Sequence, residues 1–147
     1  MAKYSKASAD KLATCHPDLQ TVFALVLKDF DHTIIEGHRT DKRQKALYAQ
    51  GRTTAGQIVT QIDGVNKKSM HQSLPSMAVD AIPFPIDWKD TDRMRYFAGH
   101  VVQAANMLYS LGVIEHKVRH GGDWDSDTDL NDQSFIDLPH YELYKPK

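Results

Sequence analysis

The sequence is poor in the features that mark secreted and membrane proteins. It has a single cysteine, Cys15, so no disulfide can form within the chain, which fits synthesis in a reducing compartment. Its longest apolar run, residues 22–27, is far too short to cross a bilayer. The first residues, MAKYSKASADKLATCHPDLQ, lack the apolar segment of a secretory signal. We therefore expect a protein that is made in soluble form and reaches any target outside the cytoplasm by another route.

An excess of charge of either sign is also missing. The chain has 18 Lys and Arg residues against 19 Asp and Glu residues, a formal net charge of -1 with neutral histidines. Because no basic cluster stands out, neither nucleic acid nor an anionic membrane surface is an expected partner. The contents of 41% hydrophobic and 25% charged residues are typical of a soluble globular protein. A length of 147 residues suffices for one core, so we predict a single domain spanning residues 1–147.

Hydrophobic spacing and capping residues predict helices and strands in an irregular order. We expect helices over residues 8–15, 16–30, 41–50 and 91–111, and strands over residues 32–35, 78–82, 113–119 and 137–145. Because helices and strands do not alternate regularly, the predicted fold class is α+β, with a small, mostly antiparallel sheet flanked by helices.

Several residues from the middle of the chain onward suit a metal ion. His71 follows a long irregular segment, of a kind that is often functional inside a compact domain. Asp80 follows the apolar run 77–79, which resembles a short strand. A carboxylate at the buried end of a strand is unfavourable unless it is paired or binds a metal ion. His140 lies near the C-terminus, three residues after Asp137. A catalytic zinc ion takes three His, Asp or Glu ligands and keeps a position for water, whose proton a nearby carboxylate can accept.

The spacing of these residues is weak evidence without further support. A histidine and an aspartate nine positions apart, or an aspartate three positions before a histidine, occur by chance in many chains. Other interpretations therefore stay open at this point. His71 would then be a loop histidine, and His140 a half-buried strand residue that bonds to the backbone.

Motifs around these residues resemble a known family. SMHQSLPSMAVDAIP resembles the S-x-H…A-x-D motif of the zinc D-alanyl-D-alanine carboxypeptidase/dipeptidase family, most of all in its phage endolysin branch, the L-alanyl-D-glutamate peptidases. DLPHYEL resembles the family's acidic-x-x-His-aromatic-Glu-Leu ending, EGHRTDKRQKALYAQGRT its G-x-R-[ST]-x3-Q block, and GGDW its Gly-Gly-Asp-Trp turn. The motifs occur in the family's order from about residue 8 to residue 144, so the resemblance covers nearly the whole chain.

The resemblance implies a Hedgehog/D,D-peptidase-like zinc fold and a set of site residues. By their positions in the motifs, His71, Asp80 and His140 would bind one zinc ion per chain. Asp137 would act as the catalytic acid/base, taking a proton from water and later delivering it to the leaving amine. Arg39 would stabilise the negative charge that develops on the scissile carbonyl.

Two further motif residues receive supporting roles. Ser69 is expected to brace the loop that carries His71, and Gln44 to support a loop from its helix. The chain also departs from the short form of the motif, because eight residues, including a Pro-Ser pair, separate His71 from Asp80. We interpret the longer arc as a loop variation beside the site that tunes substrate choice.

The resemblance implies a phage endolysin, a zinc metallopeptidase that hydrolyses the L-Ala–D-Glu bond of peptidoglycan stem peptides and so lyses the cell wall. Two alternatives stay open: a D,D-carboxypeptidase or dipeptidase acting on D-Ala termini, and a non-enzymatic zinc-dependent binding module like the Hedgehog-type domains. The expected partner is the stem peptide, bound by a monomer without nucleic acid or membrane. The protein is expected in the host cytoplasm before release and on the periplasmic cell wall when active.

The remaining acidic and histidine residues receive no part in the site. Aspartates alternate through residues 123–132, as for Ca2+, but the stretch lacks the glycine and the glutamate of an EF-hand. A solvated acidic loop is therefore the preferred interpretation over a regulatory calcium site. Five histidines have no ligand-like partner in the sequence and are interpreted as surface or core residues: His16, His32, His100, His116 and His120.

Overall fold

The computed structural model describes residues 2–147, and in this range one four-stranded sheet is surrounded by helices. The elements in chain order are α1 (Lys6–Leu12), α2 (Pro17–Leu27), β1 (His32–Glu36), α3 (Asp41–Ala49), the 3-10 helix η1 (Met70–Gln72), β2 (Ala78–Pro83), α4 (Thr91–Ser110), β3 (Lys117–His120) and β4 (His140–Tyr144). The strand order is β1-β2-β4-β3, and every neighbouring pair is antiparallel. The predicted α+β class with a small antiparallel sheet is confirmed.

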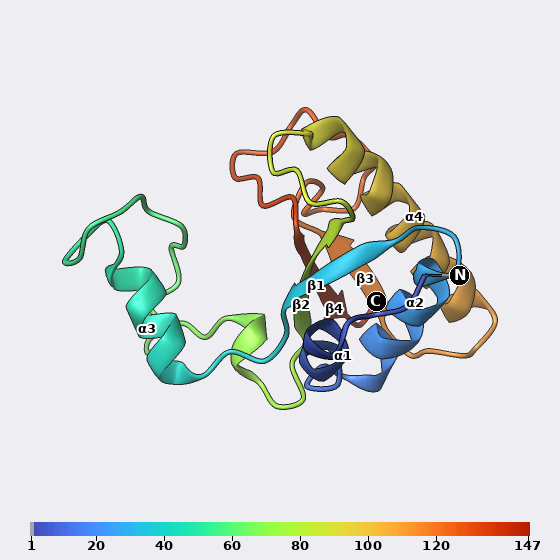
Figure 1. Ribbon diagram of the computed structural model, residues 1–147, viewed down its shortest axis with the longest axis horizontal. Coiled ribbons are helices and arrows are strands. Elements are labelled where there is room, and N and C mark those ends of the chain that lie inside the picture. The colour runs from blue at the N-terminus through green and yellow to red at the C-terminus, as the bar shows by residue number, and fades with distance from the viewer. Residues whose placement is uncertain (1) are drawn as a thin grey trace.

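The sheet has one apolar and one polar face. Because side chains alternate along a strand, Val79 and Ala81 of β2 share a face with Tyr141 and Leu143 of β4, and all four are buried. Helices α2 and α4, which lie beside the strands in Figure 1, pack their apolar residues into the same core. Asp80, between Val79 and Ala81, points to the opposite face. The main core therefore lies on one side of the sheet, and the other side carries polar residues beside a small apolar cluster around Ile82.

Residue spacing explains how α2 and α4 supply this core. Apolar residues recur three or four positions apart in both helices, so each helix has one buried stripe. The buried residues are Leu19, Val22, Phe23 and Val26 in α2, and Met94, Phe97, Ala98, Val101, Ala104, Ala105 and Leu108 in α4. Both helices were predicted from this spacing.

Several elements have other limits than predicted: α2 ends at Leu27, three residues early, and β4 begins at His140, three residues late. α1 ends at Leu12, earlier than expected, and β3 begins at Lys117, later than expected. The segment before β3 is held by α2 instead of the sheet, because the Asp18 carboxylate accepts the backbone N–H of Glu115 and lies 2.8 Å from Nδ1 of His116. This contact takes the residues before Lys117 out of the strand.

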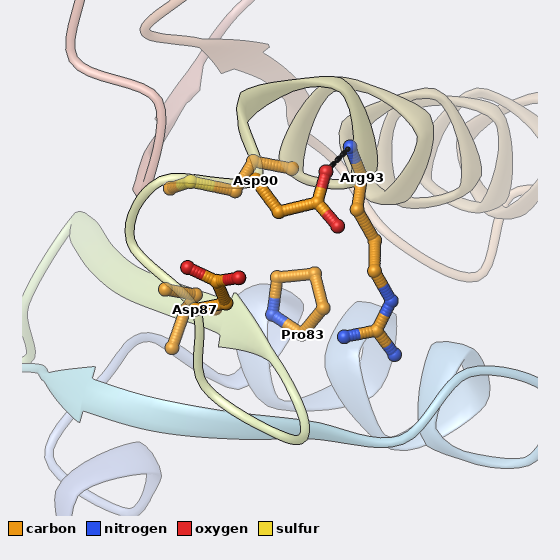
Figure 2. Close-up of a pocket in the computed structure, with 6 residues that line it drawn as sticks. Pro83, Asp87, Asp90 and Arg93 are labelled. Atoms are coloured by element: carbon orange, nitrogen blue, oxygen red, sulfur yellow. Dashed lines mark hydrogen bonds between the residues drawn. The ribbon is translucent and has the colours of Figure 1, made fainter.

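Polar side chains close the turn between β2 and α4. Asp90 caps α4, since its carboxylate accepts the backbone N–H of Arg93 at 3.1 Å (Figure 2). The Arg93 guanidinium donates to the carbonyls of Phe84 and Pro85. A small recess lies beside these residues. Since its charged groups are already engaged in the turn, we assign this recess a structural role.

Helix α3 and the loop after it project from the rest of the molecule (Figure 1). Residues 55–69 form no helix or strand, in agreement with the irregular segment expected there. Asp63 orders part of this loop, because its carboxylate accepts the backbone N–H groups of Val65, Asn66 and Lys67. Between residues 2 and 147, no helix has the length and apolar character needed to span a membrane.

Candidate active site

The polar face of the sheet gathers charged side chains from all four strands. In the antiparallel register, Asp80 of β2 stands opposite both His140 of β4 and Glu36 of β1. Opposite residues on neighbouring strands place their side chains on the same face. Glu142 lies two residues after His140, and its partner on β3 is Arg119. Strand pairing therefore brings together residues that are far apart in the sequence.

His71 reaches this row from η1. The Ser69 hydroxyl accepts the backbone N–H of His71, and the Gln72 side chain accepts that of Ser69, so both residues cap the turn. The His71 ring is buried, and its Nδ1 lies 2.7 Å from the carbonyl of Gly37. Because a carbonyl only accepts, Nδ1 donates to Gly37 and Nε2 is left for another partner. Nε2 faces Oδ1 of Asp80, with the two atoms 3.3 Å apart.

His140 is oriented in a similar way from β4. Its Nε2 donates to the Glu142 carboxylate at 2.8 Å, and Nε of Arg119 lies 3.5 Å from the other oxygen of that carboxylate. Nδ1 of His140 lies 3.3 Å from Oδ1 of Asp80. Sequence reasoning missed Glu142, although two residues after a strand histidine is a position on the same face. Because the Glu142 carboxylate binds Nε2 of His140, Nδ1 is the ring nitrogen that faces Asp80.

Two histidine nitrogens and one carboxylate oxygen thus converge in a buried place. Nε2 of His71 and Oδ1 of Asp80 are buried without a hydrogen-bond partner in the part of the chain that the structure describes, an arrangement that is costly unless something else binds there. The ligand atoms of His71, Asp80 and His140 lie within 4.8 Å of one another. Burial raises the pKa of Asp80, but the two histidines outweigh it and hold this pKa well below its usual range. The donor set fits a zinc ion.

A second group of potential ligands consists of His16, Asp18 and His116, whose ligand atoms also lie within 4.8 Å of one another. The prediction that His16 and His116 lack such a partner was wrong, because tertiary packing brings residues 98 positions apart into contact. These groups are already paired: His116 bonds to the Asp18 carboxylate, and Nδ1 of His16 accepts the backbone N–H of Asp18. The three residues form a polar clamp between α2 and the segment before β3.

The acidic loop brings a third group together, Asp123, Asp125 and Asp127. The Asp123 carboxylate accepts the backbone N–H groups of Asp127 and Thr128, so it shapes the turn. Because exposed carboxylates often lie this close without a cation, a solvated acidic loop stays the preferred prediction.

Asp137 lies near the His71–Asp80–His140 cluster. Burial raises the pKa of the Asp137 carboxyl, and the negative charge of Asp80 raises it further, against the opposite effect of His140. The backbone N–H of Asp137 donates to Gly121 at 2.8 Å, and the N–H of Gly121 donates to His140 at 2.9 Å. The glycine turn therefore fixes Asp137 and His140 relative to each other. A carboxyl group with a raised pKa is suited to proton transfer near neutral pH.

Arg39 and Gln44 lie on another side of Asp80. Arg39 donates through Nε and Nη2 to Glu36 and through Nη1 to Gln44, and its Nη2 is 3.8 Å from the Asp80 carboxylate. Gln44 is fully buried and donates its amide to the carbonyl of Ile62, so it joins α3 to the loop after it. All the motif residues expected in the site thus lie at or next to the cluster.

The arc between His71 and Asp80 packs against the junction of α1 and α2. The backbone N–H of Ser76 donates to the carbonyl of Thr14, and the carbonyl of Ser76 accepts the N–H of His16. This contact accommodates the long gap in the motif without disturbing β2.

Comparison with known proteins identifies the family. The family model for phage L-alanyl-D-glutamate peptidases matches residues 1–144. The chain belongs to this family. An L-alanyl-D-glutamate peptidase from Escherichia phage T5 is 32% identical over 149 residues, which cover 96% of this chain and 97% of that protein. The crystal structure of the Serratia marcescens L-Ala D-Glu endopeptidase ChiX is similar, with a TM-score of 0.66, 26% sequence identity, and coverage of 97% of this chain and 90% of that one. The family and fold predicted from the motifs are confirmed.

The close approach at Gly121 gives a first prediction. A Cβ atom at Gly121 would lie 2.0 Å from the carbonyl oxygen of Asp137, whereas one at Gly99, inside α4, would meet nothing within 4 Å. Gly121→Ala should lower the free energy of unfolding by about 1–3 kcal/mol and displace Asp137, with loss of activity. Gly99→Ala should raise stability by about 0.5–1 kcal/mol and leave activity unchanged. Urea denaturation and lysis assays measure both, and equal behaviour of the two variants would contradict the constraint at Gly121.

The charge of His140 gives a second prediction, which applies to the metal-free protein. Burial alone would lower the pKa of His140, but the carboxylates of Asp80 and Glu142 outweigh it and raise this pKa to about 9. Because the unfolded value is about 6.5, the stabilising contribution is complete below about pH 6.5 and is lost as pH rises through the folded value. The free energy of unfolding should fall by roughly 1 kcal/mol per pH unit between about pH 6.5 and 8.5.

Chemical denaturation at several pH values measures this slope, with His140→Gln as the control. The variant should show a flatter profile over the same range, since it has no imidazole to titrate. An equal slope in both proteins would contradict the assignment to His140.

Proposed function

We propose that this protein is a zinc peptidase that hydrolyses the L-Ala–D-Glu bond of bacterial peptidoglycan stem peptides and lyses the cell wall. Membership of the phage L-alanyl-D-glutamate peptidase family supports the substrate and the bond. The observation that carries the chemistry is the pair of histidine nitrogens that face one buried oxygen of Asp80, each 3.3 Å away. The carboxyl group of Asp137 beside this cluster supports a hydrolytic role.

The proposed zinc ligands are Nε2 of His71, Oδ1 of Asp80 and Nδ1 of His140. A zinc ion bound there would act as a Lewis acid, activating water and polarising the scissile carbonyl. The protein's own contribution is to orient the ligands: the carbonyl of Gly37 and the carboxylate of Glu142 each hold the outer nitrogen of one ring. Ser69 contributes by capping the turn that carries His71.

Asp137 is the proposed acid/base. As a carboxylate, it accepts a proton at a side-chain oxygen from the water that attacks the scissile carbonyl. As a carboxylic acid, it then donates this proton to the nitrogen of the leaving D-Glu residue. The raised pKa supports both steps, because it makes the carboxyl a better proton acceptor as a base while it still donates as an acid.

Arg39 is the proposed source of positive charge beside the reacting carbonyl. Its guanidinium is largely buried, and the contacts to Glu36 and Gln44 hold it 3.8 Å from Asp80. A fixed positive charge in such a place favours negative charge that develops on the carbonyl oxygen. Gln44 supports this arrangement from α3.

We also propose that the chain acts as a single catalytic domain and as a monomer on the stem peptide, without nucleic acid or membrane. The shared sheet and the principal core that it forms with α1, α2 and α4 support the single domain. Membership of a phage peptidase family supports accumulation in the host cytoplasm before release and action on the periplasmic wall.

Mass spectrometry of muropeptides tests the bond. Purified peptidoglycan digested with zinc-loaded protein should yield stem peptides with a free amino group on D-Glu, together with glycan strands that keep L-Ala. Release of D-Ala would instead indicate a D,D-peptidase. A zinc-loaded, folded protein without turnover on cell walls would indicate a binding module.

The role of Asp137 gives a further prediction. Asp137→Ala should lower the rate of lysis by about 100-fold or more, because general acid/base catalysis is lost, while zinc stoichiometry and the melting temperature stay close to those of the wild type. Asp129→Asn, at an exposed position of the acidic loop, is the control and should lyse normally. Full activity of Asp137→Ala would remove the acid/base assignment.

A further inference from the structure

Arg43 stands at the end of a row of alternating charges that begins at the proposed zinc ligands. Asp80 lies 3.8 Å from Nη2 of Arg39, Arg39 donates to Oε1 of Glu36, and Oε2 of Glu36 lies 3.7 Å from Nε of Arg43. The row runs from the buried cluster to the surface at the start of α3. Arg43 is thus the outermost of its four charges.

The two arginines of this row differ in how their donors are used. The Arg39 side chain is 10% exposed, and each of its three nitrogens donates to Glu36 or Gln44. The Arg43 side chain is 58% exposed, and none of its N–H groups forms a hydrogen bond within residues 2–147. Its distance to Glu36 is longer than a hydrogen bond. Arg43 therefore presents a guanidinium with free donors next to the site.

The surroundings of Arg43 favour an anion. Arg43 lies in the first turn of α3, where the cap residue Thr40 accepts its backbone N–H. The N-terminal end of the helix adds partial positive charge there. The carboxylate of Glu36 is already bonded to Arg39, so it neutralises Arg43 only in part. A guanidinium with free donors matches a carboxylate with two parallel hydrogen bonds.

Another rim of the site, formed by the acidic loop, has a different character. The Trp124 ring lies 5.4 Å from the His140 ring and stacks on Phe135. This rim belongs to the acidic loop, which includes Asp123 and Asp125, and it lies apart from α3 in Figure 1. A negatively charged group of a ligand is therefore repelled from the loop and attracted to the start of α3.

We propose that Arg43 determines specificity by binding the free α-carboxylate of the D-Glu residue in the stem peptide. This inference rests on the proposed function. In the stem peptide, D-Glu continues the chain through its side-chain carboxyl, so its α-carboxylate is free. That group is attached to the carbon next to the scissile nitrogen, and it must lie close to the site whenever the bond is in position for hydrolysis. Arg43 binds this α-carboxylate, whereas Arg39 remains hydrogen-bonded to Glu36 and Gln44.

Two synthetic stem peptides test this role. They share the L-Ala–D-Glu bond and differ in one group, an α-carboxylate in the first and a neutral α-carboxamide in the second. The zinc-loaded wild type should have about tenfold higher kcat/KM for the carboxylate, the value of one charge-assisted pair. Arg43→Gln should lose this preference by a rise in KM for the carboxylate peptide alone, with kcat unchanged.

Arg52→Gln is the matched control. Arg52 lies beyond the far end of α3, where it stacks on Tyr48 at 3.9 Å and bonds to Gln61. Removing its charge should leave the preference for the carboxylate intact.

The outcomes separate this inference from the proposed function. If the wild type cleaves neither peptide, the proposed function itself is contradicted. If the wild type cleaves both peptides with the same kcat/KM, or if Arg43→Gln loses activity equally on both peptides, Arg43 does not recognise the α-carboxylate. Either result overturns the inference.

Discussion

A single oxygen atom, Oδ1 of Asp80, is the point on which the site depends. It is buried and faces one nitrogen of each of two histidines at 3.3 Å. An ionised carboxylate without a bonded partner in such a place is unfavourable by itself. The surrounding groups make the arrangement specific, because Gly37 and Glu142 bind the outer nitrogens of the rings and leave the inner nitrogens facing Asp80. The protein thus fixes a donor set suited to zinc before any ion binds.

The residues of the main core and the residues of the proposed site lie on opposite faces of the sheet. One face carries the apolar side chains of β2 and β4 against α2 and α4, and the other carries Asp80, His140 and Glu142. Because successive residues of a strand point to opposite faces, Asp80 and Glu142 each lie directly between two core residues, and His140 directly precedes one. The packing of Val79, Ala81 and Tyr141 therefore positions the polar side chains with little freedom. The Gly121 turn adds the same precision to Asp137 through backbone hydrogen bonds.

Some charged residues around the site form hydrogen bonds within the protein, and others keep their hydrogen-bonding groups available for a ligand. Arg39 is held by Glu36 and Gln44, so its charge acts at a fixed place. The N–H donors of Arg43 remain available for a ligand. The aspartates of the acidic loop repel a carboxylate from the rim that this loop forms. The His16–Asp18–His116 cluster has ligand-like chemistry, but its groups bond to one another and tie α2 to the segment before β3. Unpaired donor atoms distinguish the proposed zinc site from this clamp.

The sequence by itself determined the helices, most of the strands, the family and the types of residue in the site. Local spacing decides which face of a helix or strand is apolar, and the order of the motifs around His71, Asp80 and His140 is specific to the family. Tertiary structure alone decided that Nε2 of His71 faces Asp80 and that Asp18 bonds to His116. These features depend on contacts between residues up to 98 positions apart. Strand register and packing set such contacts, and local spacing carries no information about them.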